Sequence, residues 1–220
     1  MRKVIKLGIK ERRQKEKELR RQQIQKAARA FFAEKGFVGT TIEDIANKAE
    51  LSPATIYQYF KDKDDLYVQL NIESLTALLK KVEKVSKNKK YNHEQKIHGF
   101  KNAMIWIFKS DPRLFKNTLQ FQLISDFKNL EMEPLGRINE LYRSILSIMA
   151  KAYQEGVQEG VIKEGLHPMA YADIVFSTFI GIMLWEDTKK RINPKKDFFK
   201  STLDKAFEMI IEGIMAPSSQ

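Results

Sequence analysis

The chain has 220 residues, 43% of them hydrophobic, which is enough to bury one large core or two smaller ones. It contains no cysteine, and this excludes a disulfide framework, a thiolate metal site and a cysteine nucleophile. The formal net charge is +11, and residues 1–29 alone hold twelve Lys or Arg against three Glu. The first ten residues are charged throughout and lack the apolar run of a signal peptide, so we expect a cytoplasmic protein.

The concentrated basic end predicts a polyanionic partner, because Lys and Arg side chains that neutralise phosphates release condensed counterions. Two other interpretations stay open at this point. The segment could be a solvated basic tail, or it could lie on anionic lipid. Binding to lipid requires an apolar face, and residues 10–23 have almost none.

Apolar spacing indicates helix nearly everywhere, so the expected fold class is all-α with about nine helices. The first helix shows its apolar pattern from Ile24 and ends at Gly36. The second is capped by Thr41, and Asp44 three residues later completes a capping box.

The next helix is short but carries clear start signals. Ser52 is a favourable N-cap and Pro53 takes the first helical position. Leu51 and Ile56 have the spacing of a hydrophobic staple, and Ile56 and Phe60 would face inward. Two short, closely joined helices of this kind predict a helix-turn-helix, whose second helix lies in a DNA major groove. The alternative is an ordinary connecting helix.

A fourth helix of roughly 23 residues follows, and a polar loop ends it. Five further helices are expected at residues 94–110, 112–127, 134–159, 168–190 and 194–216, the last four beginning near a proline. The stretch 174–185 is apolar on more than one face, so we predict a buried helix that a second copy of the chain helps to cover. We expect two domains, residues 1–67 and 68–220, linked by the fourth helix.

The positions between 32 and 66 keep the spacing of a known domain. They are Phe32, Gly36, Phe37, Thr40, Thr41, Ile42, Ile45, Ala46, Ala49, Leu51, Ser52, Thr55, Ile56, Tyr57, Tyr59, Phe60, Lys63 and Leu66. This pattern resembles the DNA-binding domain of TetR/AcrR-type bacterial transcriptional regulators. Glu50 and Ala54 depart from it, because glycine is common at both positions. At Glu50 we expect strain or altered capping in the turn.

The resemblance implies an N-terminal three-helix bundle with the helix-turn-helix, followed by a larger helical domain for ligand binding and dimerisation. It implies a homodimeric repressor that binds a palindromic operator in double-stranded DNA. The DNA contacts that it implies are Thr41, Ser52, Ala54, Thr55, Tyr57, Gln58, Tyr59 and Lys63. Of these, Gln58 is expected to read adenine, whereas Tyr57, Tyr59 and Lys63 are expected to hold phosphates.

Residues 108–122 resemble the corresponding region of relatives that sense lipophilic ligands, which predicts a lipophilic effector such as an acyl chain. The candidate pocket residues are bulky: Met104, Trp106, Phe108, Phe121, Phe127, Tyr142, Met149 and Phe176. The candidate dimer contacts are Phe179, Met183, Phe207, Ile210, Ile211 and Ile214.

An enzyme is not expected. The three histidines form no close metal-binding set, and the sequence has neither a glycine-rich phosphate loop nor a nucleophile elbow. We therefore predict no catalytic residues, no metal and no cofactor. The alternative to a ligand-responsive regulator is a basic helical protein that binds membranes or other proteins without reading DNA sequence.

Overall fold

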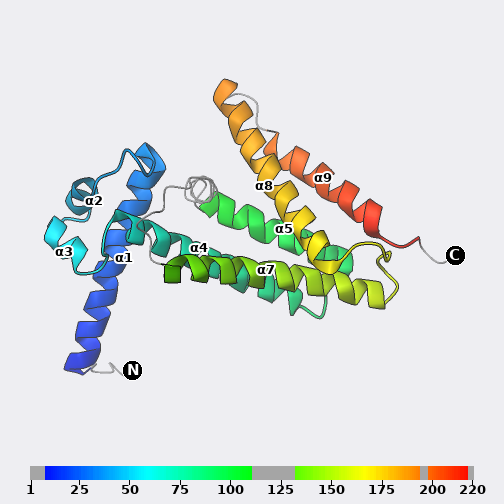
Figure 1. The fold of residues 1–220 in the computed structure, drawn as a ribbon, viewed down its shortest axis with the longest axis horizontal. Helices are drawn as coiled ribbons and strands as arrows, with labels where there is room; N and C mark the ends of the chain where they lie inside the picture. Colours follow the sequence, from blue (N-terminus) through cyan, green and yellow to red (C-terminus); the bar gives the residue numbers. More distant parts are fainter. Residues whose placement is uncertain (1–7, 111–131, 194–197, 218–220) are drawn as a thin grey trace, which may run out of the picture. The chain divides into compact units, whose positions relative to one another are not determined.

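The computed structural model describes residues 8–110, 132–193 and 198–217, and these divide into two compact units. The first unit contains the residues up to Asn71 and Met132–Leu135, and the second contains Ile72–Ser110 and the residues from Gly136 on. The division falls inside helix α4 (Lys63–Ser86), slightly beyond the boundary predicted after residue 67. Every secondary-structure element in the described residues is an α-helix (Figure 1), which confirms the expected all-α class.

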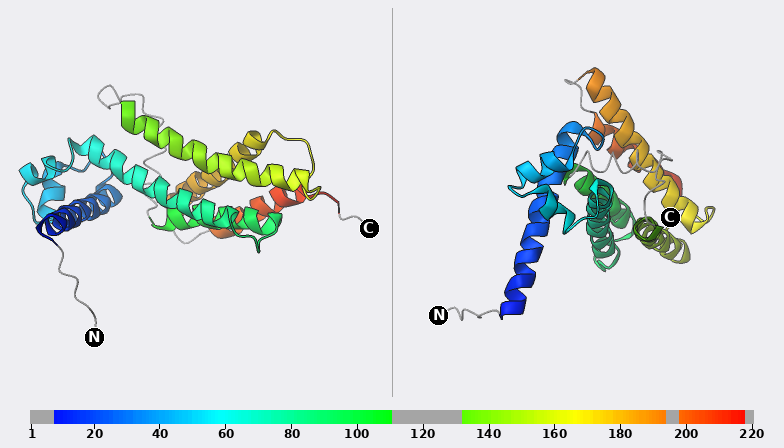
Figure 2. Two further views of the ribbon diagram at one scale, coloured as in Figure 1. Left: turned by 90° about the horizontal axis from the view of Figure 1, so that it is seen from below. Right: turned by 60° about the vertical axis from the view of Figure 1, so that its left-hand side comes forward.

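Helix α1 (Ile9–Lys35) has 27 residues and begins well before the apolar pattern at Ile24. At its start the backbone N–H of Gly8 donates to a carboxylate oxygen of Glu11 at 2.8 Å. It ends at Gly36, whose φ of 76° suits a residue without Cβ. The first turns of α1 extend beyond the other helices of this unit (Figures 1 and 2).

Helices α2 (Ile42–Lys48) and α3 (Pro53–Tyr57) and the start of α4 complete the first unit. Rings of Phe32, Phe37 and Tyr67 meet at centroid distances of 4.9 to 5.8 Å. The core side chains of this unit are at most 2% exposed: Ile24, Ala28, Phe32, Ile45, Ala46, Ala49, Ile56, Phe60, Leu66, Tyr67 and Leu70.

The second unit contains the rest of α4 and four further helices. These are α5 (His93–Ser110), α7 (Met132–Gln158), α8 (Pro168–Ile192) and α9 (Phe199–Ile214). They correspond to four of the five helices predicted for this region, and the helix predicted at residues 112–127 lies outside the described residues. Helix α9 packs against both α5 and α8.

Two polar contacts help to fix α9. The amino group of Lys101 on α5, which is 9% exposed, pairs with Asp204 on α9, and this hydrogen bond lowers the pKa of the Asp204 carboxyl. On α8, the buried Glu186 accepts a hydrogen bond from the Thr202 hydroxyl at 3.0 Å. Buried polar groups that keep such partners add specificity to a core otherwise made of apolar contacts.

Within the single chain, helix α8 is buried along one side only, which leaves the predicted cover by a second copy to its other side. Val175, Phe179 and Met183 are at most 1% exposed, whereas Ile174 is 46% and Trp185 is 61% exposed. By length and composition α8 could also cross a membrane, but a single helix of this kind is weak evidence, because the core helices of soluble proteins meet the same criterion.

Candidate DNA-binding site

The turn between α2 and α3 contains a strained residue. Glu50 has a φ of 53°, and it is the one non-glycine residue with positive φ in the described parts of the chain. A side chain in this left-handed conformation brings Cβ too close to the following carbonyl oxygen. The positive φ of Glu50 agrees with the expectation of strain at this position. Gln23 of α1 supports the turn, since its amide group donates to the carbonyl of Ala49 at 2.6 Å.

The capping box of α2 is complete. The backbone N–H of Asp44 donates to the Thr41 hydroxyl at 3.0 Å, and the N–H of Thr41 donates to the Asp44 carboxylate at 3.1 Å. The backbone hydrogen bond from Thr41, with a further one from the Lys35 side chain, lowers the pKa of Asp44. Both bonds fix where α2 begins, as the sequence predicts.

Helix α3 is fixed on its inner side and exposed on its outer side. The Ser52 hydroxyl accepts the N–H of Thr55 at 3.1 Å, so the predicted cap is confirmed. Ile56 is fully buried and Phe60 is 2% exposed, which confirms both as core residues. A helix this short is marginal alone and depends on these contacts.

Most of the predicted DNA contacts lie at the surface around α2 and α3. Thr41, Ser52, Ala54, Tyr57 and Gln58 are exposed, and Gln58 directly follows the last residue of α3. Thr55 and Tyr59 are partly buried.

Lys63 has a different position from the one predicted. Its amino group donates to the carbonyls of Phe37 and Thr40, both at 2.9 Å, and lies 4.4 Å from the centre of the Phe37 ring. Two of its three N–H groups therefore hold the segment between α1 and α2. These bonds give Lys63 a role in supporting this turn, and its expected phosphate contact stays a prediction.

A basic groove lies beside the end of α3, and the predicted DNA contacts include Gln58 and Tyr59 in its wall but not its cations. Arg13, Lys17 and Arg20 of α1 line this groove together with Gln58 and Tyr59, and its volume is about 340 Å³. The sequence shows the positive charge of this segment. It gives no apolar pattern there from which to infer which way the cations face.

The predicted pocket residues do not share one environment. Met104 and Met149 are buried, the rings of Tyr142 and Phe176 meet at 5.8 Å, and burial raises the pKa of Tyr142 to about 12. Phe108 contacts Phe199, with ring centroids 5.1 Å apart. Phe121 and Phe127 lie outside the described residues.

Trp106, also predicted as a pocket residue, lies at the surface. Its side chain is 41% exposed, and the Lys81 amino group lies 4.0 Å from the centre of its ring. A small cavity lies between α5, α7 and α8, with His93, Met149 and Tyr171 in its wall. Its volume of about 10 Å³ admits about one water molecule and no acyl chain.

Four of the six predicted dimer contacts are core residues of the single chain. Phe179, Met183, Phe207 and Ile211 are at most 7% exposed, so they have almost no surface left for a second copy. This corrects the prediction for these four. Ile210 and Ile214 are partly exposed. The large apolar side chains at the surface of α8 and α9 are instead Ile174, Trp185, Ile192 and Met209.

Comparison with known proteins agrees with the helix-turn-helix geometry. Residues 24–70 match the family model described as "Bacterial regulatory proteins, tetR family". Over 200 residues the chain is 28% identical to the fatty acid metabolism regulator protein of Bacillus subtilis (strain 168), covering 91% of this chain and 98% of the relative.

Solved structures agree as well. The crystal structure of FadR from Bacillus subtilis in complex with stearoyl-CoA has a TM-score of 0.67 and 26% identity, covering 88% of this chain and 98% of that one. FadR from Bacillus halodurans has a TM-score of 0.68 at 21% identity and covers 94% and 96%. The capped and buried α3, its exposed outer face and these similarities show that residues 24–70 form a domain similar to the DNA-binding domain of TetR-type bacterial transcriptional regulators.

Proposed function

We propose that the chain is a dimeric repressor that binds a palindromic DNA operator and is released by a long-chain acyl compound. The observation that carries the DNA-binding part is the geometry of α3. Its inner side is fixed by the Ser52 cap and by the buried Ile56 and Phe60, so its outer face is available for recognition.

Base reading and phosphate contact fall to different residues in this proposal. Gln58 carries an amide that can pair with adenine in the major groove, whereas the Tyr57 hydroxyl suits a phosphate oxygen. Both side chains are exposed, Tyr57 at 54%. Ala54, also exposed, allows close approach of the helix backbone to the DNA.

The test is selection of binding sites from random duplex DNA, followed by affinity measurement for two variants. Gln58→Ala should lose about 1 to 3 kcal/mol on the selected site and relax the preference at one base pair. Tyr57→Phe should weaken binding to all sequences about equally. If the wild-type protein selects no palindrome over random duplex, it does not act as a sequence-specific repressor.

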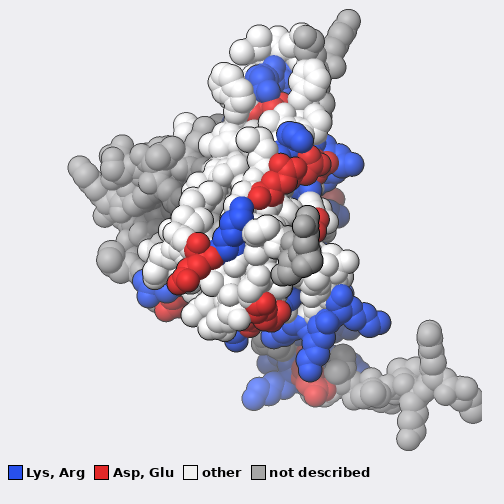
Figure 3. All heavy atoms as spheres, turned by 90° about the vertical axis from the view of Figure 1, so that its right-hand side faces the viewer, with Lys and Arg blue, Asp and Glu red and all other residues white. Residues whose placement is uncertain are grey.

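The surface of α8 supports a dimer. Ile174, Gly181, Trp185 and Ile192 recur at steps of seven, four and seven residues, which places them on one exposed stripe without charge. Figure 3 shows broad uncharged areas on the side of the molecule where the chain ends. Large apolar stripes on a soluble protein mark interaction surfaces, and a second copy is the occupant that a palindromic operator requires.

The similarity to the fatty acid metabolism regulator of Bacillus subtilis, and to a FadR structure from that organism that holds stearoyl-CoA, supports this effector class. A ligand can release DNA only if it binds the DNA-free form more tightly. A hundredfold release requires about 2.7 kcal/mol of differential binding, which an apolar chain can supply.

Stearoyl-CoA, free CoA and stearate are suitable probes in a gel-shift titration of the selected operator. We expect stearoyl-CoA to release the DNA at a concentration where CoA alone does not. Native mass spectrometry then gives the number of ligands per chain. Binding of stearoyl-CoA without loss of DNA would exclude it as the effector.

A further inference from the structure

We propose that the exposed N-terminal half of α1 binds DNA phosphates beside the base pairs that α3 contacts, through a face made by Arg13, Lys17 and Arg20. This inference rests on the proposed DNA-binding function and extends the contact surface beyond the helix-turn-helix. The matched part of the family model begins at residue 24, so this half of the helix lies outside it.

The three cations continue the inner face of α1. Ile24 is the first buried residue of this helix, and Arg20, Lys17 and Arg13 precede it at steps of four, three and four residues. Such steps keep side chains on one face of a helix. The face that packs into the core after Ile24 therefore continues toward the N-terminus as a basic face, where the cations are exposed.

The basic face is joined to the recognition surface. The groove of about 340 Å³ has Arg13, Lys17 and Arg20 on one side and Gln58 and Tyr59 on the other. Because Gln58 and Tyr59 directly follow α3, DNA that reaches the outer face of α3 comes within reach of these long cationic side chains. Glu16 also lines the groove, and Arg20 lies 3.7 Å from it.

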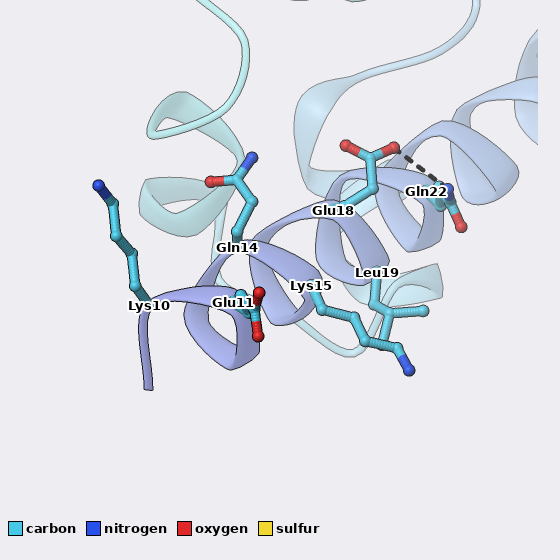
Figure 4. A pocket seen from close by; sticks show the side chains of 7 residues that line it. All are labelled: Lys10, Glu11, Gln14, Lys15, Glu18, Leu19 and Gln22. Atoms are coloured by element: carbon cyan, nitrogen blue, oxygen red, sulfur yellow. Dashed lines mark hydrogen bonds between the residues drawn. The ribbon is translucent and has the colours of Figure 1, made fainter. Parts of the chain in front are cut away.

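The other surface of the same stretch is different in charge (Figure 4). It presents Lys10, Glu11, Gln14, Lys15, Glu18, Leu19 and Gln22, which include two cations and two anions. Glu18 accepts a hydrogen bond from the Gln22 amide at 3.1 Å. The groove beside α3 is thus lined by three cations and one anion, whereas the charges of the other surface balance.

The size of this half also fits a nucleic acid. From Ile9 to Gln23 it has about 15 residues, which span about 22 Å of helix, the length of about six base-pair steps. Local contacts hold it as a helix without a packed core, including the bond from Gly8 to Glu11 and the pair of Glu16 with Arg20. The basic face contains no large apolar side chain, which disfavours a lipid surface as its partner.

Two double variants test the inference because they remove equal charge from the two surfaces. Arg13→Gln with Lys17→Gln changes the basic face, and Lys10→Gln with Lys15→Gln changes the other surface. Glutamine keeps a high helix propensity, so circular dichroism should be unchanged for both. The measurement is operator affinity against salt concentration for the full chain.

The first double variant should reduce the slope of log K against log salt by about 2, since each lost phosphate contact removes about 1. The second should change the slope by clearly less. In hydroxyl-radical footprinting, the first variant should also lose protection at the backbone beside the α3 contacts.

Equal slope changes for the two variants, with an unchanged footprint, would overturn the inference and leave operator binding intact. The same holds if both variants keep the wild-type slope. Absence of any preferred operator for the wild-type chain is a separate result, because it contradicts the proposed function itself.

Discussion

Glu50 adopts a backbone conformation that glycine adopts without strain. The left-handed conformation costs an L-residue with a Cβ about 1 to 2 kcal/mol, and Glu50 has a φ of 53°. We therefore expect Glu50→Gly to raise the free energy of unfolding by about 1 kcal/mol. Glu50→Ala removes the same charge but keeps Cβ, so it is the matched control. Urea unfolding measures both, and equal stability of the two variants would show that the turn is not strained.

Lys63 gives a second prediction at a single position. Lys63→Met removes the donor for two carbonyls, which should lower the free energy of unfolding by about 2 kcal/mol. The slope of operator affinity against salt should stay near that of the wild-type protein, because the amino group bonds to carbonyls of the chain and not to DNA phosphates. A slope that falls by about one, with unchanged stability, would return Lys63 to the phosphate contacts.

The contrast between Ser52 and Lys63 shows which side-chain positions the sequence predicts. A cap such as Ser52 acts within three residues of itself, so local spacing is enough to identify it. Lys63 reaches carbonyls 23 and 26 residues away in the chain. Its role depends on how the helices pack, and spacing along the chain does not contain that information.

Among the helices, α1 and α8 show where apolar periodicity misleads. Periodicity reports burial, so it marks α1 only from Ile24, although the helix begins at Ile9. The pattern of α8 predicts burial, but it does not tell which apolar side chains the chain itself covers and which are left for a second copy. Ile174 and Phe179 are both apolar, yet they are 46% and 0% exposed.

The contact between α5 and α9 should depend on pH. The hydrogen bond from Lys101 lowers the pKa of Asp204 in the folded chain, so this pair stabilises the fold above the unfolded value, near 3.9. That contribution is lost as the pH falls through the folded pKa. At pH 7 the Asp204→Asn variant should be less stable than the wild-type protein by about 1 to 3 kcal/mol. Because the Asp204 side chain is 37% exposed, solvent screening places the loss toward the lower end of this range.

The measurement is urea unfolding of the wild-type protein and Asp204→Asn between pH 7 and pH 2. The two stabilities should converge at the acidic end. A difference that stays constant over this range would mean that ionisation of Asp204 does not contribute.

For the whole molecule, the central prediction concerns the exposed stripe of α8. Trp185→Glu places a charge where a second copy would bury it, so the proposed dimer should dissociate. Light scattering coupled to gel filtration measures the mass. Lys84→Glu introduces the same residue at an exposed position of α4 and should keep the wild-type mass. An unchanged mass for Trp185→Glu would place the dimer contact elsewhere.

The order of the helices and the two-part organisation could be predicted because they follow from local patterns and breaks in the sequence. Which side chains lie at the surface of the folded chain could not be predicted in this way. Phe207 and Met209 are two residues apart on α9, and only packing decides that the first is buried and the second is 64% exposed. The predicted dimer contacts therefore included four residues of the core.

The bonds of Lys63 have a consequence for how regulation can work. They tie the first turn of α4 to the segment between α1 and α2, and Arg21 of α1 reaches Gln69 of α4 at 3.4 Å. Because of these bonds, we expect the helix-turn-helix and the first two turns of α4 to move together. Binding of an effector can then change the affinity of the protein for its operator without changing which bases the protein prefers. Induction and sequence preference can evolve separately in this chain.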